Sequence, residues 1–571
     1  MLEISSKTNL LEQKSYKYSL QDVAEPNLQR DVYSYGTIPK VAFNHRRVPM
    51  SMPEEIWITD TSLRDGQQSV EPYTVNQIVD LYKMLSRLGG PKGIIRQTEF
   101  FVYSQKDREA VRRCQDLGYA FPEITTWIRA TREDFRMVKD LGIKETGILV
   151  SCSDYHIFKK MQMTRRQALD YYLATVKDAF DAGVMPRCHL EDITRADFYG
   201  FVVPFVNELM ELSHQAKIPV RIRACDTMGY GVPYTEVALP RSVPGIIYGL
   251  QHYSGVESEY LEWHGHNDFY KAVANAATAW LYGASGVNCS MLGIGERTGN
   301  VDAVTLAMNL YSHGVDPRLD FSDMPAICAA YERVTRMHIY ERTPYAGQLV
   351  FAAFSGSHQD AIAKGMAYRK ERGEHRWTCP YIPIDPHDIG RTYDADVIRI
   401  NSQSGKGGIG FVLEQNYGYN LPPKMREVLG YKVKSVSDHS HKELSAGEVL
   451  RIFEESFLNR EKPLRVVEAH FAQVNGITAT VTLDLNGQRK VVTSVGNGRL
   501  DAVANAIQSA TGMDFHLESY SEHSLDEGST SRAASYVGLA WGDGSVTWGA
   551  GTDTDIIVAG IKALVSAINS K

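Results

Sequence analysis

The chain has 571 residues, 43% of them hydrophobic and 23% charged, with a formal net charge of −7. This size allows two or more domains with a large core, and the charge gives no electrostatic case for binding nucleic acid or acidic membranes. No apolar run approaches the roughly 20 residues that a membrane-spanning helix needs. Seven cysteines are scattered without a CxxC pair, and the N-terminus is too polar for a signal peptide, so we expect a reducing, cytoplasmic location.

Short β-like runs alternate with helical stretches from about residue 52 to residue 315. The runs cover residues 56–60, 93–101, 123–130, 146–153, 185–192, 220–227, 260–268 and 286–295. Eight β/α units in one stretch of this length predict a TIM barrel. A doubly wound sheet is the rival, but no glycine-rich phosphate fingerprint follows the first run. Residues 1–51 precede this barrel as an extension without a predicted role.

The rest of the chain divides into two further parts. Residues 316–440 are helical at first and then rich in Gly, Pro and polar residues, which we interpret as helical linker subdomains. Residues 441–571 contain two similar stretches, 481–510 and 536–568, each with an Asn-Gly or Asp-Gly turn between alternating runs and a helix after them. Such turns are strong hairpin signals. We therefore expect a pseudo-symmetric α+β module with a binding or dimerisation role.

Two histidines, His264 and His266, stand one residue apart in the seventh run. In a strand both point to the same face, and two neutral imidazoles side by side suit a divalent metal. A pair of surface histidines is the alternative. Other polar residues favour the metal, because they follow one run after another at the end where barrel enzymes keep their chemistry. These residues are Asp60, Arg64, Asp65, Glu99, His156, Glu191 and Thr227.

Asp60 with the two histidines would supply two nitrogens and a carboxylate and leave positions open for a substrate. Zinc fits these ligands, and manganese or magnesium are possible because mixed nitrogen and oxygen ligands are not selective. Such a metal would polarise the carbonyl of a 2-oxo acid. Arg64 could stabilise the developing oxyanion, or it could form an ion pair with Asp65 or Glu99, and a Glu99 pair would also orient it.

Three motifs stand out along the barrel part, namely DTSLRDGQQ (60–68), HGHND (264–268) and GIGERTGN (293–300). Together they resemble the metal-dependent, acyl-CoA-condensing TIM-barrel family that includes 2-isopropylmalate, homocitrate, citramalate and Re-type citrate synthases. PYAGQLVFAAFSGSHQDAI (344–362), PYIPIDPHDIGRTY (380–393) and INSQSGKGG (400–408) resemble the helical subdomain of the longer type of 2-isopropylmalate synthase. VGNGRLDAVANAI and GAGTDTDI resemble its leucine-responsive regulatory domain.

The resemblance implies roles that the residues alone do not. Asn300 would add an oxygen ligand to the metal, and His358 and Tyr381 would remove the methyl proton of acetyl-CoA. Glu191 joins Arg64 as a catalytic candidate, and Asp65, Glu99, His156 and Thr227 are substrate-binding candidates. Structural hydrogen bonding is the alternative for Glu191 and His156, loop capping for Asp65, and a turn role for Thr227.

The reaction implied by the resemblance is a Claisen-type condensation. Acetyl-CoA and 3-methyl-2-oxobutanoate would give 2-isopropylmalate and CoA, as the committed step of leucine biosynthesis. A homodimer and feedback by leucine at the C-terminal module are expected in the same way.

Alternatives remain open. HGHND, QTEFF and CHLEDITRADFYGFVVPF look closer to Re-type citrate and homocitrate synthases, so the 2-oxo acid could be oxaloacetate, 2-oxoglutarate or pyruvate. A dicarboxylate would need a cation such as Arg96, Arg129 or Arg195, whereas a branched tail needs an apolar pocket. A metal-dependent aldolase or a biotin-dependent carboxyltransferase barrel can share a similar opening motif and a His-x-His pair, but neither would need the later domains.

Overall fold

The computed structural model describes residues 2–4, 11–13, 18–29, 43–44, 47–312, 314–353, 355–393, 406–440, 444–473, 476–525 and 531–571. Residues 400–405 of the motif INSQSGKGG therefore lie outside the described residues. The chain divides into two compact units. The first comprises Met1–Val350 with Ile389–Arg391, and the second Phe351–Asp388 with Thr392–Lys571.

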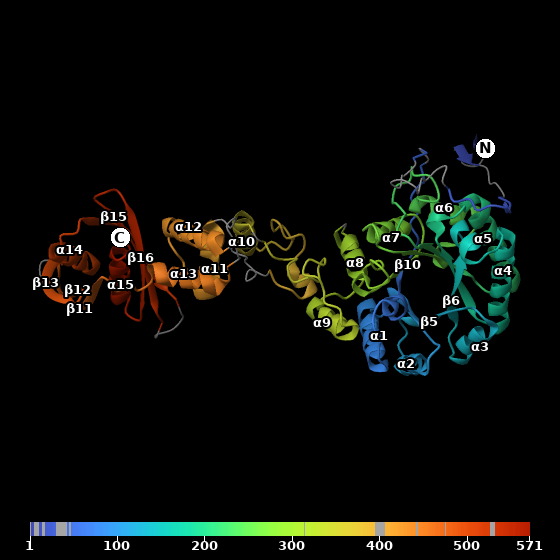
Figure 1. The fold of residues 1–571 in the computed structure, drawn as a ribbon, viewed down its shortest axis with the longest axis horizontal. Coiled ribbons are helices and arrows are strands. Elements are labelled where there is room, and N and C mark those ends of the chain that lie inside the picture. The colour runs from blue at the N-terminus through green and yellow to red at the C-terminus, as the bar shows by residue number, and fades with distance from the viewer. Residues whose placement is uncertain are drawn as a thin grey trace. The chain divides into compact units, whose positions relative to one another are not determined.

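The first unit contains a closed barrel of eight parallel strands, which confirms the predicted TIM barrel (Figure 1). The order is β10-β3-β4-β5-β6-β7-β8-β9, and every strand coincides with one of the predicted runs. The strands are β3 (Trp57–Asp60), β4 (Ile95–Phe100), β5 (Glu123–Ile128), β6 (Glu145–Ser151), β7 (Met185–Glu191), β8 (Arg221–Asp226), β9 (Leu261–Gly265) and β10 (Gly286–Cys289).

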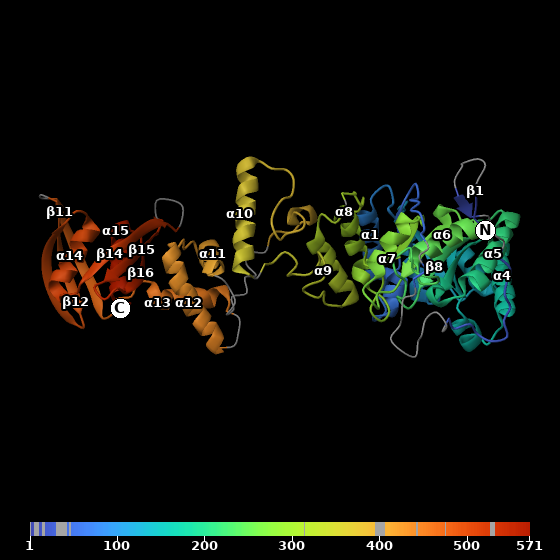
Figure 2. The same ribbon diagram turned by 90° about the horizontal axis from the view of Figure 1, so that it is seen from above.

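Helices surround this barrel on its outer side (Figures 1 and 2). They are α1 (Val75–Gly89), α2 (Gln105–Gln115), α3 (Arg132–Asp140), α4 (Arg165–Ala182), α5 (Val203–Ala216), α6 (Val243–Ser254), α7 (Ala272–Leu281) and α8 (Ala303–Ser312), followed by α9 (Met324–Thr335). Helices α1 to α4 each begin with a complete capping box, from Thr74, Ser104, Thr131 and Thr164. A capping box satisfies two free backbone N–H groups at once and fixes the first residue of the helix. These caps therefore define where each βα loop ends.

Ion pairs fill part of the barrel interior. Arg187 and Arg223 are fully buried, and so are Glu99 and Glu262. Arg187 lies 3.0 Å from Glu99, and Arg223 bridges Glu99 at 2.5 Å and Glu262 at 3.0 Å. Buried charges persist in proteins when they are paired and hydrogen-bonded, as these are.

The second unit begins with α10 (Gly356–Arg372) and continues through α11 (Lys406–Tyr417), α12 (Pro423–Ser440) and α13 (Ala446–Phe457). A strand-strand-strand-helix motif then occurs twice. The first copy is β11 (Leu464–Gln473), β12 (Ile477–Leu485), β13 (Gln488–Gly496) and α14 (Arg499–Thr511). The second is β14 (Phe515–Ser524), β15 (Ala533–Trp541), β16 (Val546–Asp553) and α15 (Ile556–Ile568). Both sheets are antiparallel, and the predicted Asn-Gly and Asp-Gly turns join β12 to β13 and β15 to β16. The two similar stretches identified in the sequence did not include the first strand of each copy.

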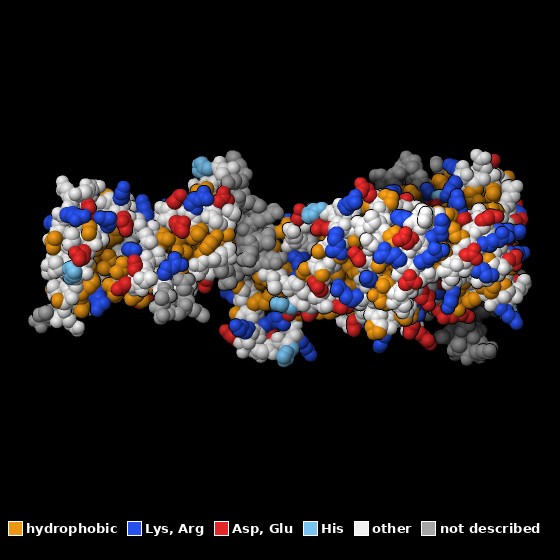
Figure 3. All heavy atoms as spheres, turned by 90° about the horizontal axis from the view of Figure 1, so that it is seen from below, with side chains coloured by type: hydrophobic (Ala, Val, Ile, Leu, Met, Phe, Trp, Pro, Cys, Tyr) orange, Lys and Arg blue, Asp and Glu red, His pale blue; other side chains and the backbone are white. Residues whose placement is uncertain are grey.

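At the N-terminus, β1 (Leu2–Ile4) and β2 (Leu11–Gln13) pair antiparallel. The face in Figure 3 carries acidic and basic side chains interspersed. No helix in the described part of the chain is both long and apolar enough to span a membrane.

Candidate active site

His264 and His266 lie together at the C-terminal end of β9, both buried, with their Nε2 atoms 3.2 Å apart. Asn288 fixes the first ring. Its amide nitrogen donates to the backbone oxygen and hydroxyl of Thr59, so its Oδ1 accepts a hydrogen bond of 2.7 Å from Nδ1 of His264. The Nε2 of His264 is therefore unprotonated, and its lone pair faces His266. Burial lowers the pKa of His264, and burial and the neighbouring imidazole lower that of His266 to about 4. Both rings are neutral at pH 7, the form that binds metals.

Asp65 completes this cluster. It lies in the π-helical turn Ser62–Gly66 that follows β3, and its ligand atoms and those of the two histidines lie within 4.8 Å of one another. Burial tends to raise the pKa of Asp65, but the charge of Arg64 and the hydrogen bond from Asn300 hold it below its usual value, so the carboxylate is charged. Within the described residues, no other group of His, Cys, Asp and Glu side chains has metal-site geometry.

Asp60, the carboxylate expected to bind the metal, does not lie in this cluster. Thr59 reaches Glu262 and Thr61 reaches Glu99 inside the barrel, so Asp60 between them points outward. Its oxygens accept hydrogen bonds from Ser62 and Thr98. Burial raises the pKa of Asp60 to about 7. The prediction chose the wrong aspartate of DTSLRD because strand alternation puts Asp60 on the outer face, whereas the turn returns Asp65 to the mouth.

Asn300, the fourth expected ligand, lies beside the cluster. Its amide nitrogen donates to Asp65 at 2.8 Å, and His266 and Asn300 form an isolated β-bridge. Its Oδ1 is buried and has no hydrogen-bond partner among the described residues. An unsatisfied buried oxygen next to a carboxylate and two imidazole lone pairs is costly without a cation. The donors present therefore fit a divalent metal.

Arg64 and Glu99 form one buried arrangement. Arg64 donates from Nε and Nη2 to Oε2 of Glu99 and from Nη1 to Asp65, and its guanidinium lies 5.9 Å from the ring of Trp127. The ion pairs predicted for Arg64 are therefore present with both Asp65 and Glu99, and its role at the oxyanion stays a prediction. Glu99 is fully buried and also contacts Arg187 and Arg223. Its geometry positions Arg64, and it exposes no surface to a substrate.

His156 and Glu191 meet at the ends of β6 and β7. Nδ1 of His156 lies 3.1 Å from Oε2 of Glu191, and its Nε2 lies 3.6 Å from Asp192. Burial opposes ionisation of Glu191, but the adjacent His156, the hydrogen bond from Ser151 and the charge of Lys160 lower its pKa to about 2. Glu191 is thus a charged hydrogen-bond acceptor at neutral pH.

Thr227 follows β8, and its hydroxyl accepts a hydrogen bond of 2.8 Å from the backbone of Asp192. Arg297 lies in the motif GIGERTGN, where the sequence suggested no specific role for it. It donates to the backbone oxygen of Thr227 and binds Asp268 with two nitrogens. Nothing in the sequence spacing links these positions, because they are 70 residues apart and meet only in the barrel.

Three further mouth residues, Trp127, Leu149 and His189, were also missed. In the parallel ladder Trp127 is in register with Gly147 and Leu149 with His189. His189 points inward, 3.9 Å from Glu99, so its register partner Leu149 points inward as well. Leu149 is nonetheless 37% exposed, which places it beside open space. Alternation along strands 123–128, 145–151 and 185–191 could have identified the inward positions.

His358 and Tyr381 belong to the second unit. Their rings stack with centroids 4.0 Å apart, His358 in the first turn of α10 and Tyr381 in a left-handed backbone conformation with φ of 62°. Tyr381 is 62% exposed. The pair predicted to act together is therefore adjacent.

A parallel barrel with two histidines, an aspartate and an arginine at the C-terminal strand ends is the arrangement of a metal-dependent TIM-barrel enzyme. Family models agree with this class. Residues 55–330 match the HMGL-like family, residues 348–414 the alpha-isopropylmalate synthase post-catalytic domain-like family, and residues 443–571 the LeuA allosteric (dimerisation) domain. Enzymes of the HMGL-like family depend on a divalent metal.

Known enzymes of similar sequence indicate a smaller group within this class. A 2-isopropylmalate synthase of Desulfitobacterium hafniense is 38% identical over 89% of this chain and 92% of its own length. A citrate (Re)-synthase of Clostridium kluyveri is 52% identical over 61% of this chain and 78% of its own length. A 2-isopropylmalate synthase of Helicobacter hepaticus is 50% identical over 58% of this chain and 62% of its own length.

The chain belongs to the alpha-isopropylmalate synthase family. It is an acyltransferase of the class that condenses acetyl-CoA with a 2-oxo acid.

Proposed function

We propose that this enzyme is a 2-isopropylmalate synthase, which joins acetyl-CoA and 3-methyl-2-oxobutanoate and releases CoA after hydrolysis of the thioester. The observation that carries the proposal is the likeness to a 2-isopropylmalate synthase over about nine-tenths of both chains, through the barrel, the helical part and the C-terminal domain. We assign the catalytic barrel to residues 52–315, the linker subdomains to 316–440 and a regulatory domain to 441–571.

The proposed metal ligands are Asp65, His264 and His266 with Oδ1 of Asn300, and zinc, manganese or magnesium would suit them. Bound there, a divalent cation would polarise the carbonyl of the 2-oxo acid. Arg64 would stabilise negative charge on that carbonyl oxygen during bond formation. It is suited to this because Glu99 and Asp65 hold its guanidinium in place before the substrate arrives, so little reorganisation is needed.

The other site residues we assign as follows. Glu191, charged and held by His156, would accept a hydrogen bond from the substrate, and Thr227 would lie near its carboxylate. His358 and Tyr381 would remove the methyl proton of acetyl-CoA, because a thioester α-proton is weakly acidic and needs a positioned base. The stacking of their rings supports a joint role.

An apolar wall favours a branched 2-oxo acid. Trp127 and the exposed, inward-facing Leu149 offer carbon surface at the mouth. Two of the arginines considered for binding a dicarboxylate are poorly suited to it, because one lies far from the mouth and the other is already ion-paired. Arg96 stacks on Trp57 at the N-terminal end of the strands, and Arg195 is bound to Asp192.

We predict that the enzyme turns over 3-methyl-2-oxobutanoate with a higher kcat/KM than oxaloacetate, 2-oxoglutarate or pyruvate. Leu149→Ala should lower kcat/KM for 3-methyl-2-oxobutanoate by about 10- to 100-fold and that for pyruvate by less, because pyruvate lacks the two methyl groups that pack there. The rate of CoA release measures kcat/KM for both 2-oxo acids. Leu281→Ala, at a similarly exposed leucine on α7, is the matched control and should change neither. A preference for oxaloacetate in the wild-type enzyme would refute the proposal.

A Re-type citrate synthase is the second candidate, and the 52% identity to the Clostridium kluyveri enzyme supports it. Arg129 would then bind the distal carboxylate. It is exposed at the end of β5, and its guanidinium lies 4.6 Å from the centroid of the Tyr103 ring. The substrate comparison above separates the two candidates.

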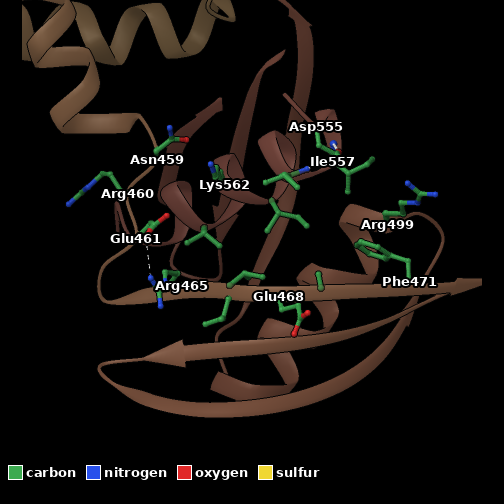
Figure 4. A pocket seen from close by; sticks show the side chains of 16 residues that line it. Asn459, Arg460, Glu461, Arg465, Glu468, Phe471, Arg499, Asp555, Ile557 and Lys562 are labelled. Atoms are coloured by element: carbon green, nitrogen blue, oxygen red, sulfur yellow. Dashed lines mark hydrogen bonds and ion pairs between the residues drawn. The ribbon is translucent and has the colours of Figure 1, made fainter. Parts of the chain in front are cut away.

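Leucine is the proposed feedback ligand, and a pocket of about 280 Å³ in the C-terminal domain suits it. Apolar residues of β11 and α15, including Val466, Ile557 and Ile561, line it. Figure 4 shows charged side chains of both signs around it, among them Arg465, Arg499 and Asp555. An amino acid needs this combination, with an anion for its ammonium group, a cation for its carboxylate and apolar surface for its side chain. We also propose that this domain forms a homodimer.

Asp555→Asn should weaken leucine binding about tenfold or more, since it removes one charge-assisted contact. The substitution spares the helix, because Asp555 caps α15 through Ile557 and Val558, and asparagine caps equally well. Titration calorimetry on the full chain measures the Kd, with Asp543→Asn as the control at an exposed site. If the wild-type chain does not bind leucine, or D555N binds it equally well, this site assignment is wrong.

A further inference from the structure

Within the first unit, the segment from Tyr18 to Gln29 lies against the barrel part near the loops that follow β6 and β7. Its first residue stacks on Tyr199 with centroids 4.9 Å apart and meets Tyr253 edge-on at 5.5 Å. The backbone N–H of Gln21 donates to the carbonyl of Gly200 at 3.1 Å. We call residues 18–29 the N-terminal strap. It is attached at several points, and the residues it contacts are over a hundred positions away in the sequence.

Arg165 connects the strap to the barrel. The side chain of Arg165 is fully buried at the start of α4, where it binds both oxygens of Asp154 at 2.9 and 2.7 Å and Asp197 at 3.0 Å. Its Nη1 also donates to the carbonyl of Gln21 at 3.1 Å. The backbone N–H of Asn27 donates to Oδ2 of Asp154, the oxygen that also accepts from Arg165. Two strap backbone groups thus complete the hydrogen bonding of a buried ion pair.

The next residue after Asp154, Tyr155, is held by the strap as well. Its hydroxyl donates to the carbonyl of Leu28 at 3.3 Å. The guanidinium of Arg195 lies 4.1 Å from the centroid of the Tyr155 ring, and Arg195 in turn binds Asp192. The strap therefore holds the side chains of Asp154 and Tyr155, the two residues at the start of the π-helical turn Tyr155–Lys160.

His156 follows directly and reaches the mouth, 3.1 Å from Glu191 and 3.6 Å from Asp192. Lys160, at the end of the same turn, also contacts Glu191 at 3.1 Å. An imidazole can hold this geometry only while the backbone that carries it is fixed. The strap contacts the two residues before His156 through their side chains, at Oδ2 of Asp154 and at the hydroxyl of Tyr155. Displacement of a positioned group by about 1 Å can cost about a hundredfold in rate.

We propose that the N-terminal strap, acting through Asp154 and Tyr155, positions His156 against Glu191 for binding of the 2-oxo acid. The strap residues are thus positioning residues for the reaction, and Arg165 is the buried connection between them and the site. The kinetic part of this proposal depends on the proposed function, whereas the structural part does not.

The test compares three forms of the enzyme, the full-length chain and two truncations. Removal of residues 1–29 deletes the strap, and removal of residues 1–17 is the matched control that keeps it. Hydrogen–deuterium exchange of residues 153–160, measured without substrate, should rise about tenfold or more only in the longer truncation. The KM for the 2-oxo acid should rise about tenfold in the same form, while the KM for acetyl-CoA stays the same. A synthetic peptide of residues 18–29 should restore both.

Unchanged exchange in residues 153–160 after loss of the strap would overturn the proposal, as would equal effects of the two truncations. If the longer truncation fails to fold, Asn27→Pro and Asn27→Ala replace it. Both lose the side-chain oxygen that accepts from Gln29, but only Asn27→Pro also removes the N–H that reaches Asp154. Faster exchange in N27P than in N27A supports the proposal, and equal exchange refutes it. Full-length enzyme that turns over no 2-oxo acid refutes the proposed function and leaves the exchange comparison intact.

Discussion

Asp65→Asn should release the divalent metal and lower kcat about a thousandfold, whereas Asp60→Asn should keep the metal. Asp65 is the charged carboxylate within 4.8 Å of the two imidazoles, and its replacement leaves the cation with one anionic ligand fewer. Loss of the several kcal/mol that a cation contributes to stabilising the transition state corresponds to about 10³ in rate. Metal content after dialysis and the rate of CoA release are the two measurements.

Asp60→Asn is a matched control because both positions are buried aspartates in the same motif. The amide oxygen of the substituted side chain would still accept hydrogen bonds from Ser62 and Thr98. At a position whose pKa is raised to about 7, loss of the charge removes little. Loss of metal from D60N with retention in D65N would reverse our assignment and restore the ligand set expected from the sequence.

The barrel could be predicted from sequence because each strand is a short run of its own, followed by a helix with a local cap. To predict a barrel from eight such units requires only the local pattern of each unit and the rule that eight parallel strands close into a barrel. The histidine pair was predictable for the same reason, since two residues on one strand share a face. The carboxylate was not, because its position depends on the turn Ser62–Gly66, whose π-helical geometry no spacing rule reveals.

The roles of the other site residues depend on contacts between residues that are far apart in the sequence. Glu99 looks like any polar residue at a strand end, yet the structure surrounds it with arginines from two distant strands and from the loop after β3. The N-terminal strap was unpredictable for the same reason. Its residues form no motif, and its role follows only from its hydrogen bonds with Asp154 and Arg165. Such roles depend on which strands become neighbours, which a single sequence shows poorly.

Glu99→Gln tests this buried arrangement and should lower the free energy of unfolding by about 3–5 kcal/mol. Glu99 is fully buried, and although burial opposes its ionisation, Arg223 and Arg64 hold its pKa well below the usual value. Its charge is therefore needed by its arginine neighbours, and a neutral amide leaves them with an uncompensated positive charge inside the barrel. Urea unfolding followed by circular dichroism gives the difference.

The same substitution should reduce kcat more than it changes KM, because Arg64 would lose the partner of its Nε and Nη2 groups while the substrate surface stays the same. Glu123→Gln is the control. It lies at the exposed start of β5, where its carboxylate accepts from Gln97 at 3.3 Å, and should change the stability by less than about 0.5 kcal/mol. A Glu99→Gln enzyme as stable as the Glu123→Gln enzyme would mean that Glu99 is not the anion on which the arginines of the barrel depend.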